Sequence, residues 1–235
     1  MDLTVAHDKR FCNLIEFFWP LEGKTINDVH DAVVNAYGLL GAGFAYLNTS
    51  ALIKSLDGSS IGCYELWRKD TDFDELSATV LAPVVESLKA VASYDFYLTD
   101  IIAGGSKSGA PQVFSTGKIY YIAEFPLDPD YQDVFFSDIK AFFDKQLLEL
   151  AEFISYTISK ATDHSRIVII EEWDSVAAAR KLALALTNLP HSPLKDRNPS
   201  KSSNTFENLY IYHSAQTPAQ EDDLQSSSAL TSNSE

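Results

Sequence analysis

The 235-residue sequence predicts an α+β fold made of two tandem copies of one βαββαβ unit. Two recurring motifs support this prediction. PLE at 20–22 and PLD at 126–128 each close an apolar run, and ELW at 65–67 recurs as EEW at 171–173. Both pairs have the same offset of 106 residues, which indicates a duplication rather than chance.

Each half has the hydrophobic pattern of the same series of elements. In the first half we expect strands at 11–19, 43–52, 59–68 and 93–102, and helices at 25–39 and 73–91. The first helix is indicated by apolar side chains three or four residues apart, at Ile26, Val29, Val33 and Tyr37. In the second half we expect strands at 117–126, 152–160, 165–173 and 206–213, and helices at 130–149 and 174–188.

These elements divide the chain into two repeats, a connection and a tail. We assign residues 1–103 to the first repeat and 117–213 to the second. Residues 104–116 contain the Gly, Ser and Pro content of a linker. Residues 214–235 are rich in Ser and acidic groups, lack aromatic side chains, and are predicted to be a disordered tail.

The order βαββαβ is typical of the ferredoxin-like arrangement, a four-stranded antiparallel sheet with both helices on one face. Its other face is apolar and needs a cover, for which a second copy of the same sheet is suited. We therefore expect the two sheets to pack face to face as an intramolecular barrel. The chain would then be a monomer with an internal pseudo-dimer.

Composition excludes several classes of partner. The formal net charge of −15 argues against nucleic acid and anionic membrane surfaces. No apolar run approaches the roughly 20 residues of a membrane span, and no signal peptide is recognisable, so we expect a cytoplasmic protein. Two cysteines and the absence of CxxC or HExxH patterns predict no metal site, and no cofactor is expected.

The segment EEWDSVAAARKLALALTNLPHSP at 171–193 resembles the antibiotic biosynthesis monooxygenase family of the dimeric α+β barrel superfamily, with a weaker version at 64–88. The resemblance implies a ligand pocket between sheet and helices. It also implies cofactor-independent oxygenation of aromatic, polyketide-like molecules, or their cyclisation. The heme-degrading members are a poorer match, because Leu182 stands near the position of their helical Trp.

The candidate catalytic residues are His30, as a general base, and Tyr64. His30 interrupts the apolar stripe of the first helix, and a buried, hydrogen-bonded core role is its alternative. Four residues in predicted strands and one in a predicted turn are candidates for substrate binding: Tyr46, Asn48, Trp67, Trp173 and His191. The Trp residues are equally expected as packing anchors, and Glu65 and Glu171 as half-exposed strand carboxylates or, if desolvated, as bases.

Two functions remain open from the sequence. The first is an enzyme acting on an apolar aromatic or polyketide-like substrate by proton abstraction, leading to oxygenation or cyclisation. The second is a non-catalytic ligand-binding or stress-related barrel. An open cavity lined by His30, Tyr46, Asn48 or Tyr64 would favour the enzyme. In the second half, we expect Phe side chains of the first helix to fill the pocket: Phe135, Phe136, Phe142 and Phe143.

Overall fold

The computed structural model describes most of the folded part of the chain. The described ranges are 3–5, 10–40, 47–76, 78, 81–109, 112–114, 118–179 and 204–213. The predicted tail at 214–235 and two candidate site residues, Tyr46 and His191, lie outside these ranges. Most of the predicted helix at 174–188 also lies outside them; of its described part, 174–179, residues 176–179 are helical.

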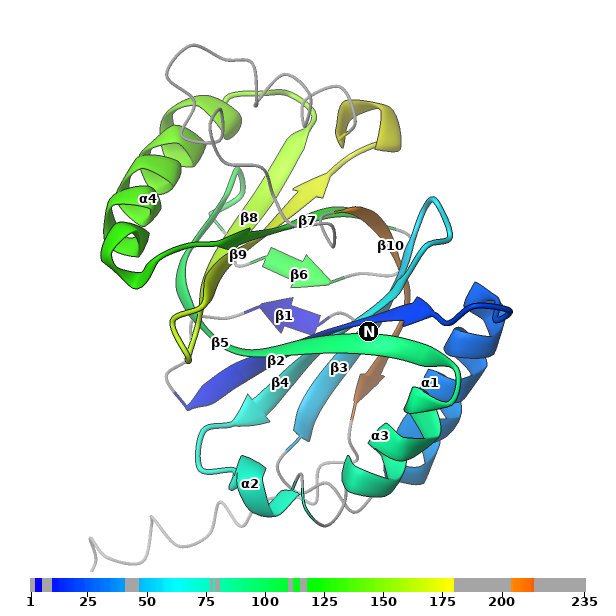
Figure 1. Ribbon diagram of the computed structural model, residues 1–235. Coiled ribbons are helices and arrows are strands. Elements are labelled where there is room, and N and C mark those ends of the chain that lie inside the picture. Colours follow the sequence, from blue (N-terminus) through cyan, green and yellow to red (C-terminus); the bar gives the residue numbers. More distant parts are fainter. Residues whose placement is uncertain are drawn as a thin grey trace, which may run out of the picture.

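Eight strands form one closed antiparallel barrel, with helices outside it (Figure 1). The first half of the chain contributes β2 (Phe11–Pro20), β3 (Leu47–Ser55), β4 (Ile61–Arg68) and β5 (Ala92–Ser106). The second half contributes β7 (Ile119–Pro126), β8 (Phe153–Ala161), β9 (Arg166–Trp173) and β10 (Asn204–His213). Their order around the barrel is β10-β3-β4-β2-β5-β8-β9-β7. The fold is therefore α+β with an antiparallel sheet.

Two long strands join the halves. β5 pairs with β2 from Ala92 to Thr99 and then with β8 from Thr99 to Ser106. β10 likewise pairs with β7 near its start and with β3 along the rest of its length. The two halves are thus hydrogen-bonded edge to edge into one continuous barrel, because each long strand supplies backbone partners to both.

The linker predicted at 104–116 is wrong in part, because its first three residues end β5 and it also contains β6 (Gln112–Phe114). The glycines suggested flexibility, but they serve close packing. A Cβ at Gly105 would lie 2.7 Å from Cε1 of Tyr156 on the neighbouring strand β8. A glycine in a strand often marks such a close approach, so this segment is ordered by its cross-strand contact.

Helices cover the outside of the barrel in two groups (Figure 1). α1 (Ile26–Leu40), the short α2 (Phe73–Leu76) and α3 (Ala82–Lys89) belong to the first half. α4 (Pro129–Phe142) belongs to the second half and continues as one π-helical turn, η3 (Phe143–Leu147). Of the helix predicted at 73–91, the structure describes α2, α3 and two helical residues between them, 78 and 81, whereas 77, 79 and 80 lie outside the described residues. Pro83 lies in the first turn of α3, where a proline is tolerated.

The barrel interior is filled by side chains. Alternate residues of the strands point inward, including Ile15, Phe17 and Tyr64. β1 (Leu3–Val5) pairs with β6, and both lie within the outline of the barrel (Figure 1). Phe114 of β6 is fully buried, with its ring centroid 4.9 Å from that of Tyr64 and 4.6 Å from that of Tyr120.

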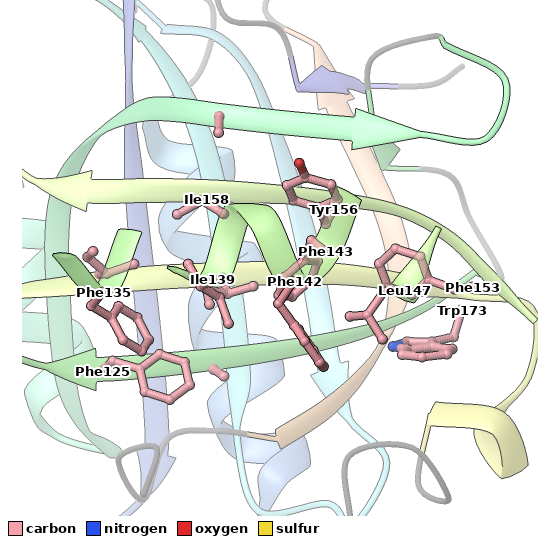
Figure 2. Packing of buried hydrophobic residues seen from close by; sticks show 14 of the residues in the cluster. Phe125, Phe135, Ile139, Phe142, Phe143, Leu147, Phe153, Tyr156, Ile158 and Trp173 are labelled. Atoms are coloured by element: carbon pink, nitrogen blue, oxygen red, sulfur yellow. The ribbon is translucent and has the colours of Figure 1, made fainter. Parts of the chain in front are cut away.

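The space between α4 and the sheet is packed with aromatic side chains, in agreement with the Phe-filled second half that the sequence predicts (Figure 2). Phe143 is fully buried between Phe153 and Tyr156, at centroid distances of 5.9 and 4.7 Å. Phe125 packs on Phe135 at 5.2 Å. The remaining labelled core residues of Figure 2 are Ile139, Phe142, Leu147, Ile158 and Trp173.

Arg166 holds the two halves together at the barrel interior. Its Nη1 donates to Oε2 of the buried Glu124 at 3.0 Å, and its Cζ lies 3.7 Å from the ring centroid of Tyr97 on β5. We expect Arg166→Leu to lower the free energy of unfolding by about 3 kcal/mol, because it leaves a carboxylate buried without its cation. Urea denaturation measures this loss.

The matched control for Arg166→Leu is Lys140→Leu, which removes the exposed ion pair between Lys140 and Asp144. That change should cost less than about 1 kcal/mol, since exposed pairs contribute little. Equal losses in the two variants would show that the Arg166 contact does not hold the halves together.

Candidate functional site

A small, mostly apolar cavity lies in the first half, between the sheet and the helices. Its volume is about 40 Å³, enough for roughly three water molecules. Its polar side chains are Glu16 of β2, Tyr37 of α1 and Glu65 of β4. Its apolar walls include Leu14, Phe18, Trp67, Val84, Leu88 and Tyr94. The resemblance noted above implied a pocket in this position.

Strand alternation places the two carboxyl groups on the same side of the sheet. On β2, Glu16 points toward the helices while its neighbours Ile15 and Phe17 point into the barrel. Glu65 projects from β4 on that same helix-facing side. The two strands are paired, with Glu16 opposite Cys63. Glu16 and Glu65 therefore stand on adjacent strands, close enough to share one hydrogen-bonding partner.

That shared partner is Tyr37, in the last turns of α1. The buried stripe of this helix carries Val29, Val33 and Ala36, so the Tyr37 side chain also faces the sheet. Its Oη lies 2.7 Å from Oε2 of Glu16 and is hydrogen-bonded to Oε1 of Glu65. We call Glu16, Tyr37 and Glu65 the acid triad.

The acid triad must hold an extra proton. The Tyr37 hydroxyl has one hydrogen and can donate it to only one carboxylate. The contact with the other carboxyl group then needs a proton on that group, which donates to Tyr37 Oη. At least one of Glu16 and Glu65 is therefore a neutral acid while both contacts exist.

Electrostatics agrees with this proton count. Burial raises the pKa of Glu65, and the nearby Glu16 charge raises it further, against the lowering effect of its hydrogen bonds from Tyr37 and Trp67. Burial also raises the pKa of Glu16. The indole Nε1 of Trp67 donates to Oε2 of Glu65 at 2.5 Å and holds that carboxyl group in place. Glu16 keeps part of its surface accessible, whereas Glu65 is 2% exposed.

Cys63 lies beside the acid triad but has no activated thiolate. Burial raises the pKa of its thiol well above the usual range, and the charges of Glu16 and Glu65 raise it further. A thiol in such surroundings is a poor nucleophile. The chemistry available in this cavity is therefore proton transfer between oxygen groups and a bound molecule.

The second half retains only part of this arrangement. Trp173 Nε1 donates to Glu171 Oε2 at 3.0 Å, as Trp67 does to Glu65. The buried residues of α4 and η3 have the same spacing as those of α1. When the two helices are aligned by this spacing, Phe143 occupies the position of Tyr37. A phenyl ring cannot donate a hydrogen bond, so the described residues of the second half contain no shared-proton pair.

The position that corresponds to Glu16 in the second half also lacks a carboxyl group. Phe18 pairs with Ile61 on β4, and Phe125 pairs with Ile167 on β9, so Phe125 is the structural counterpart of Phe18. Ala123 is then the counterpart of Glu16. In this register, the PLE and PLD motifs are shifted by one residue relative to each other. The offset of 106 residues therefore holds between β4 and β9 but not between β2 and β7.

The structure separates the candidate catalytic residues from the cavity. His30 lies on α1 with a side chain that is 35% exposed, and its Nδ1 is 3.0 Å from Asp31 Oδ1. It does not line the cavity. Tyr64 points into the barrel, where its hydroxyl donates to Oδ1 of Asn13 at 2.6 Å.

The structure also places the expected binding residues. Trp67 lines the cavity, whereas Trp173 is 1% exposed in the second-half core, 4.7 Å from Phe153 between ring centroids. Asn48 lies on β3, and its side chain is outside what the structure describes. The interpretation of Glu65 and Glu171 as half-exposed carboxylates is wrong, because both are buried by the helices that cover them.

Sequence reasoning missed Glu16 and Tyr37, although each left a signal. Glu16 is the one charged side chain in the run FCNLIEFFWP. Tyr37 carries a hydroxyl on an otherwise apolar helix stripe, and the residue 106 positions later is Phe143. The comparison that singled out His30 against Phe136 would have found Tyr37 against Phe143 two helical turns further along.

Two aromatic rings line one edge of the cavity, and a third continues the row to the surface. Phe18 is 1% exposed and stacks on Tyr94 at 6.2 Å and 26°. Tyr94 in turn stacks on Phe96 at 6.1 Å and 14°, and Phe96 is 55% exposed. The strand register sets Phe96 directly opposite Glu16. We call Phe18, Tyr94 and Phe96 the aromatic row; it runs from the cavity wall to solvent beside the more accessible carboxyl group.

Within the described ranges, no group of three or more His, Cys, Asp or Glu side chains is placed to hold a metal ion. No helix in the part of the chain that the structure describes is long and apolar enough to cross a membrane.

No protein-family model and no curated protein matches the sequence, but solved structures do. An anthrone oxidase-like protein matches with a TM-score of 0.72 and 12% identity, covering 92% of this chain and 98% of its own. A proposed monooxygenase from Fusobacterium nucleatum matches with a TM-score of 0.55 and 9% identity, covering 86% and 94%. Another from Lactobacillus acidophilus matches with a TM-score of 0.51 and 11% identity, covering 88% and 97%. The chain therefore shares the fold of these monooxygenase-like proteins over nearly its full length.

Proposed function

We propose that this protein is a cofactor-independent enzyme that removes a proton from an apolar, electron-rich aromatic substrate and lets the resulting carbanion react with O₂. The observation that carries the proposal is the acid triad in the wall of an apolar cavity. An ionisable carboxyl group in such surroundings has a raised pKa and is matched to a weakly acidic C–H group. Trp67 and the aromatic row offer flat surfaces to an aromatic ring.

The chemistry balances without a metal or flavin. The Glu16 carboxylate takes a proton from a carbon activated by adjacent rings and a carbonyl group, and the substrate carbanion transfers electrons to O₂. For anthrone, one O₂ is consumed, anthraquinone forms, and the second oxygen atom leaves as water. The same base would drive a ring closure if the substrate carried a second carbonyl group within reach.

The cavity of about 40 Å³ is smaller than an aromatic substrate, so binding requires the roof to move. That roof is α3, a helix of eight residues whose first turn has no side-chain cap. Leu81 and Val85 of the roof are half-buried. Their outward displacement would open the cavity toward the aromatic row.

The test is oxygen consumption with anthrone, chosen because one similar structure is an anthrone oxidase-like protein. We expect the purified protein to consume one O₂ per anthraquinone formed, above the rate in buffer, with no added metal or cofactor and in the presence of a chelator. Oxidation at the buffer rate, with anthrone bound, would contradict the proposal and favour a ligand-binding protein.

That second function, a non-catalytic ligand-binding barrel, is favoured by the small size of the cavity and by the filled second half. It predicts binding of flat aromatic molecules without turnover. Calorimetric titration with anthraquinone, set beside the oxygen measurement, separates the two functions.

We further infer that the two halves are tandem copies and that the closed barrel replaces a dimer. Because both long strands find their partners within one chain, no strand edge of the barrel is left open for a second copy. We expect a monomer of 26.0 kDa in sedimentation equilibrium. A concentration-independent dimer would contradict this inference.

The exposed end of the aromatic row is expected to contribute to binding. Phe96→Leu should weaken the binding of anthraquinone by roughly two- to tenfold, because it removes one stacking surface while keeping an apolar side chain. The control is Tyr131→Leu, which changes an aromatic residue that is 58% exposed on α4. Equal affinities of the wild type and Phe96→Leu would exclude Phe96 from the binding surface.

A further inference from the structure

We propose that the first-half cavity also catalyses keto–enol tautomerisation of an apolar aryl ketone, with Tyr37 relaying a proton between Glu16 and Glu65. This inference rests on the proposed function in using the same cavity, but it requires no O₂. The substrate class is an aromatic ring system fused to an enolisable ketone. Its flat ring faces the apolar wall, and its carbonyl and adjacent C–H group face the acid triad.

The geometry supplies one acid and one base at the same time. The triad contains two carboxyl groups and one phenol, and the hydrogen-bond count requires a proton on one carboxyl group while it allows the other to be ionised. A lone carboxylate would serve only as a base. Tautomerisation is faster when one group takes the carbon-bound proton while another gives a proton to the carbonyl oxygen.

The roles follow from accessibility and contacts. Glu16 is partly exposed and lines the cavity, so its carboxylate is placed to remove the α-proton. Tyr37 also lines the cavity, and its hydroxyl donates to the ketone oxygen. Glu65 is deeply buried and held by Trp67, so it acts through Tyr37 rather than on the substrate. Glu65 is a positioning residue and a proton store.

The step is balanced. The α C–H bond breaks and its proton goes to Glu16, while the electron pair forms the new C=C bond. The C=O bond becomes C–O, and its oxygen receives the Tyr37 proton as Tyr37 Oη accepts the proton of Glu65. Glu16 is then neutral and Glu65 ionised. Transfer from Glu16 through Tyr37 to Glu65 restores the starting state, so no oxidant or reductant enters the cycle, and the acid protons of the triad exchange with solvent between turnovers.

The second half shows what the relay needs. Glu171 and Trp173 keep the hydrogen bond of Glu65 and Trp67, but Phe143 and Ala123 stand in place of Tyr37 and Glu16. A buried carboxyl group is therefore compatible with this fold without a relay. Among the described residues, the first half adds the hydroxyl and the second carboxyl group, and the cavity borders both.

The experiment measures hydrogen–deuterium exchange at the α-carbons of β-tetralone by NMR, in deuterium oxide under argon. The wild-type protein should accelerate exchange over buffer, and Tyr37→Phe should reduce that acceleration by about 100-fold. Phenylalanine is the residue that the fold already has at position 143, which corresponds to Tyr37. Tyr156→Phe is the matched control, since Tyr156 is a buried tyrosine whose hydroxyl donates to Asp144 Oδ1 at 2.5 Å in the second half. The Tyr156→Phe protein should catalyse exchange at the wild-type rate.

The outcomes are decisive. Exchange at the buffer rate with the wild-type protein, or an undiminished rate in Tyr37→Phe, would overturn the proposal. If Tyr37→Phe does not fold, as judged by circular dichroism, Glu16→Gln provides the second variant, with the same expected loss. Exchange without aerobic oxidation of anthrone would support the tautomerase proposal and contradict the oxygenase proposal. Oxidation of anthrone without exchange would support the oxygenase proposal and contradict the tautomerase proposal.

Discussion

Glu16→Gln should reduce the oxidation of anthrone by about a hundredfold or more, because an amide cannot accept the substrate proton. The amide has the size of the carboxyl group and can still bond to Tyr37, so the thermal unfolding midpoint should stay within a few degrees of the wild-type value. Steady-state oxygen consumption measures the rate. The loss should appear in kcat rather than in KM, since the carboxylate acts in the transition state and not in holding the ring.

The control for Glu16→Gln is Glu172→Gln. Glu172 is also a strand carboxyl group, and it accepts a hydrogen bond from Ser155 at 2.7 Å on the second half's side of the barrel. Wild-type oxidation by Glu16→Gln would remove Glu16 from the mechanism. The pH dependence gives a second check. Because burial raises the pKa of Glu16, the wild-type rate should rise with pH above the range of an ordinary glutamate.

The second large effect is a loss of stability as pH rises, caused by Glu171. Burial raises the pKa of this carboxyl group to about 8, against the lowering effect of its hydrogen bond from Trp173. Between the ordinary glutamate pKa and about 8, the folded protein binds a proton that the unfolded chain does not. The free energy of unfolding therefore falls as pH rises through that window, by up to roughly 4 kcal/mol for this group.

Glu171→Gln should remove the part of this fall that comes from Glu171, because its amide is neutral at every pH, whereas the parts from Glu16 and Glu65 remain. Urea denaturation at pH values from about 5 to 8 measures the slope for the wild type and the variant. Glu149→Gln, at an exposed position in the same half, is the control and should keep the wild-type slope. If the Glu171→Gln protein loses stability over this window as the wild type does, Glu171 is ionised in the fold.

The site illustrates why sequence reasoning found the cavity's location and one wall but not its acid triad. Trp67 was recognisable because it belongs to a motif that recurs in EEW. His30 was chosen because a histidine on an apolar stripe stands out, yet its position on α1 turns it partly to solvent beside Asp31. Tyr37 looks like an ordinary core aromatic until the helix is docked and its hydroxyl meets two carboxyl groups.

In the barrel, too, some features follow from local sequence and others depend on contacts between distant residues. Periodicity of apolar residues was enough to predict α1, β2, β4 and β9, because the spacing of buried side chains depends only on local geometry. The extension of β5 into the glycine-rich stretch depends on Tyr156, which is distant in sequence and fits only where Cβ atoms are missing.

The sequence by itself therefore determined the α+β class, most of the strands and the Phe-filled second half, since each follows from residue types and their spacing along one segment. Tertiary structure alone decided that the long strands β5 and β10 join both halves into one barrel, and that Glu16, Tyr37 and Glu65 share a proton. Hydrogen bonds and burial at these places are made by residues from different elements. Their pKa values and protonation depend on distances that no single segment encodes.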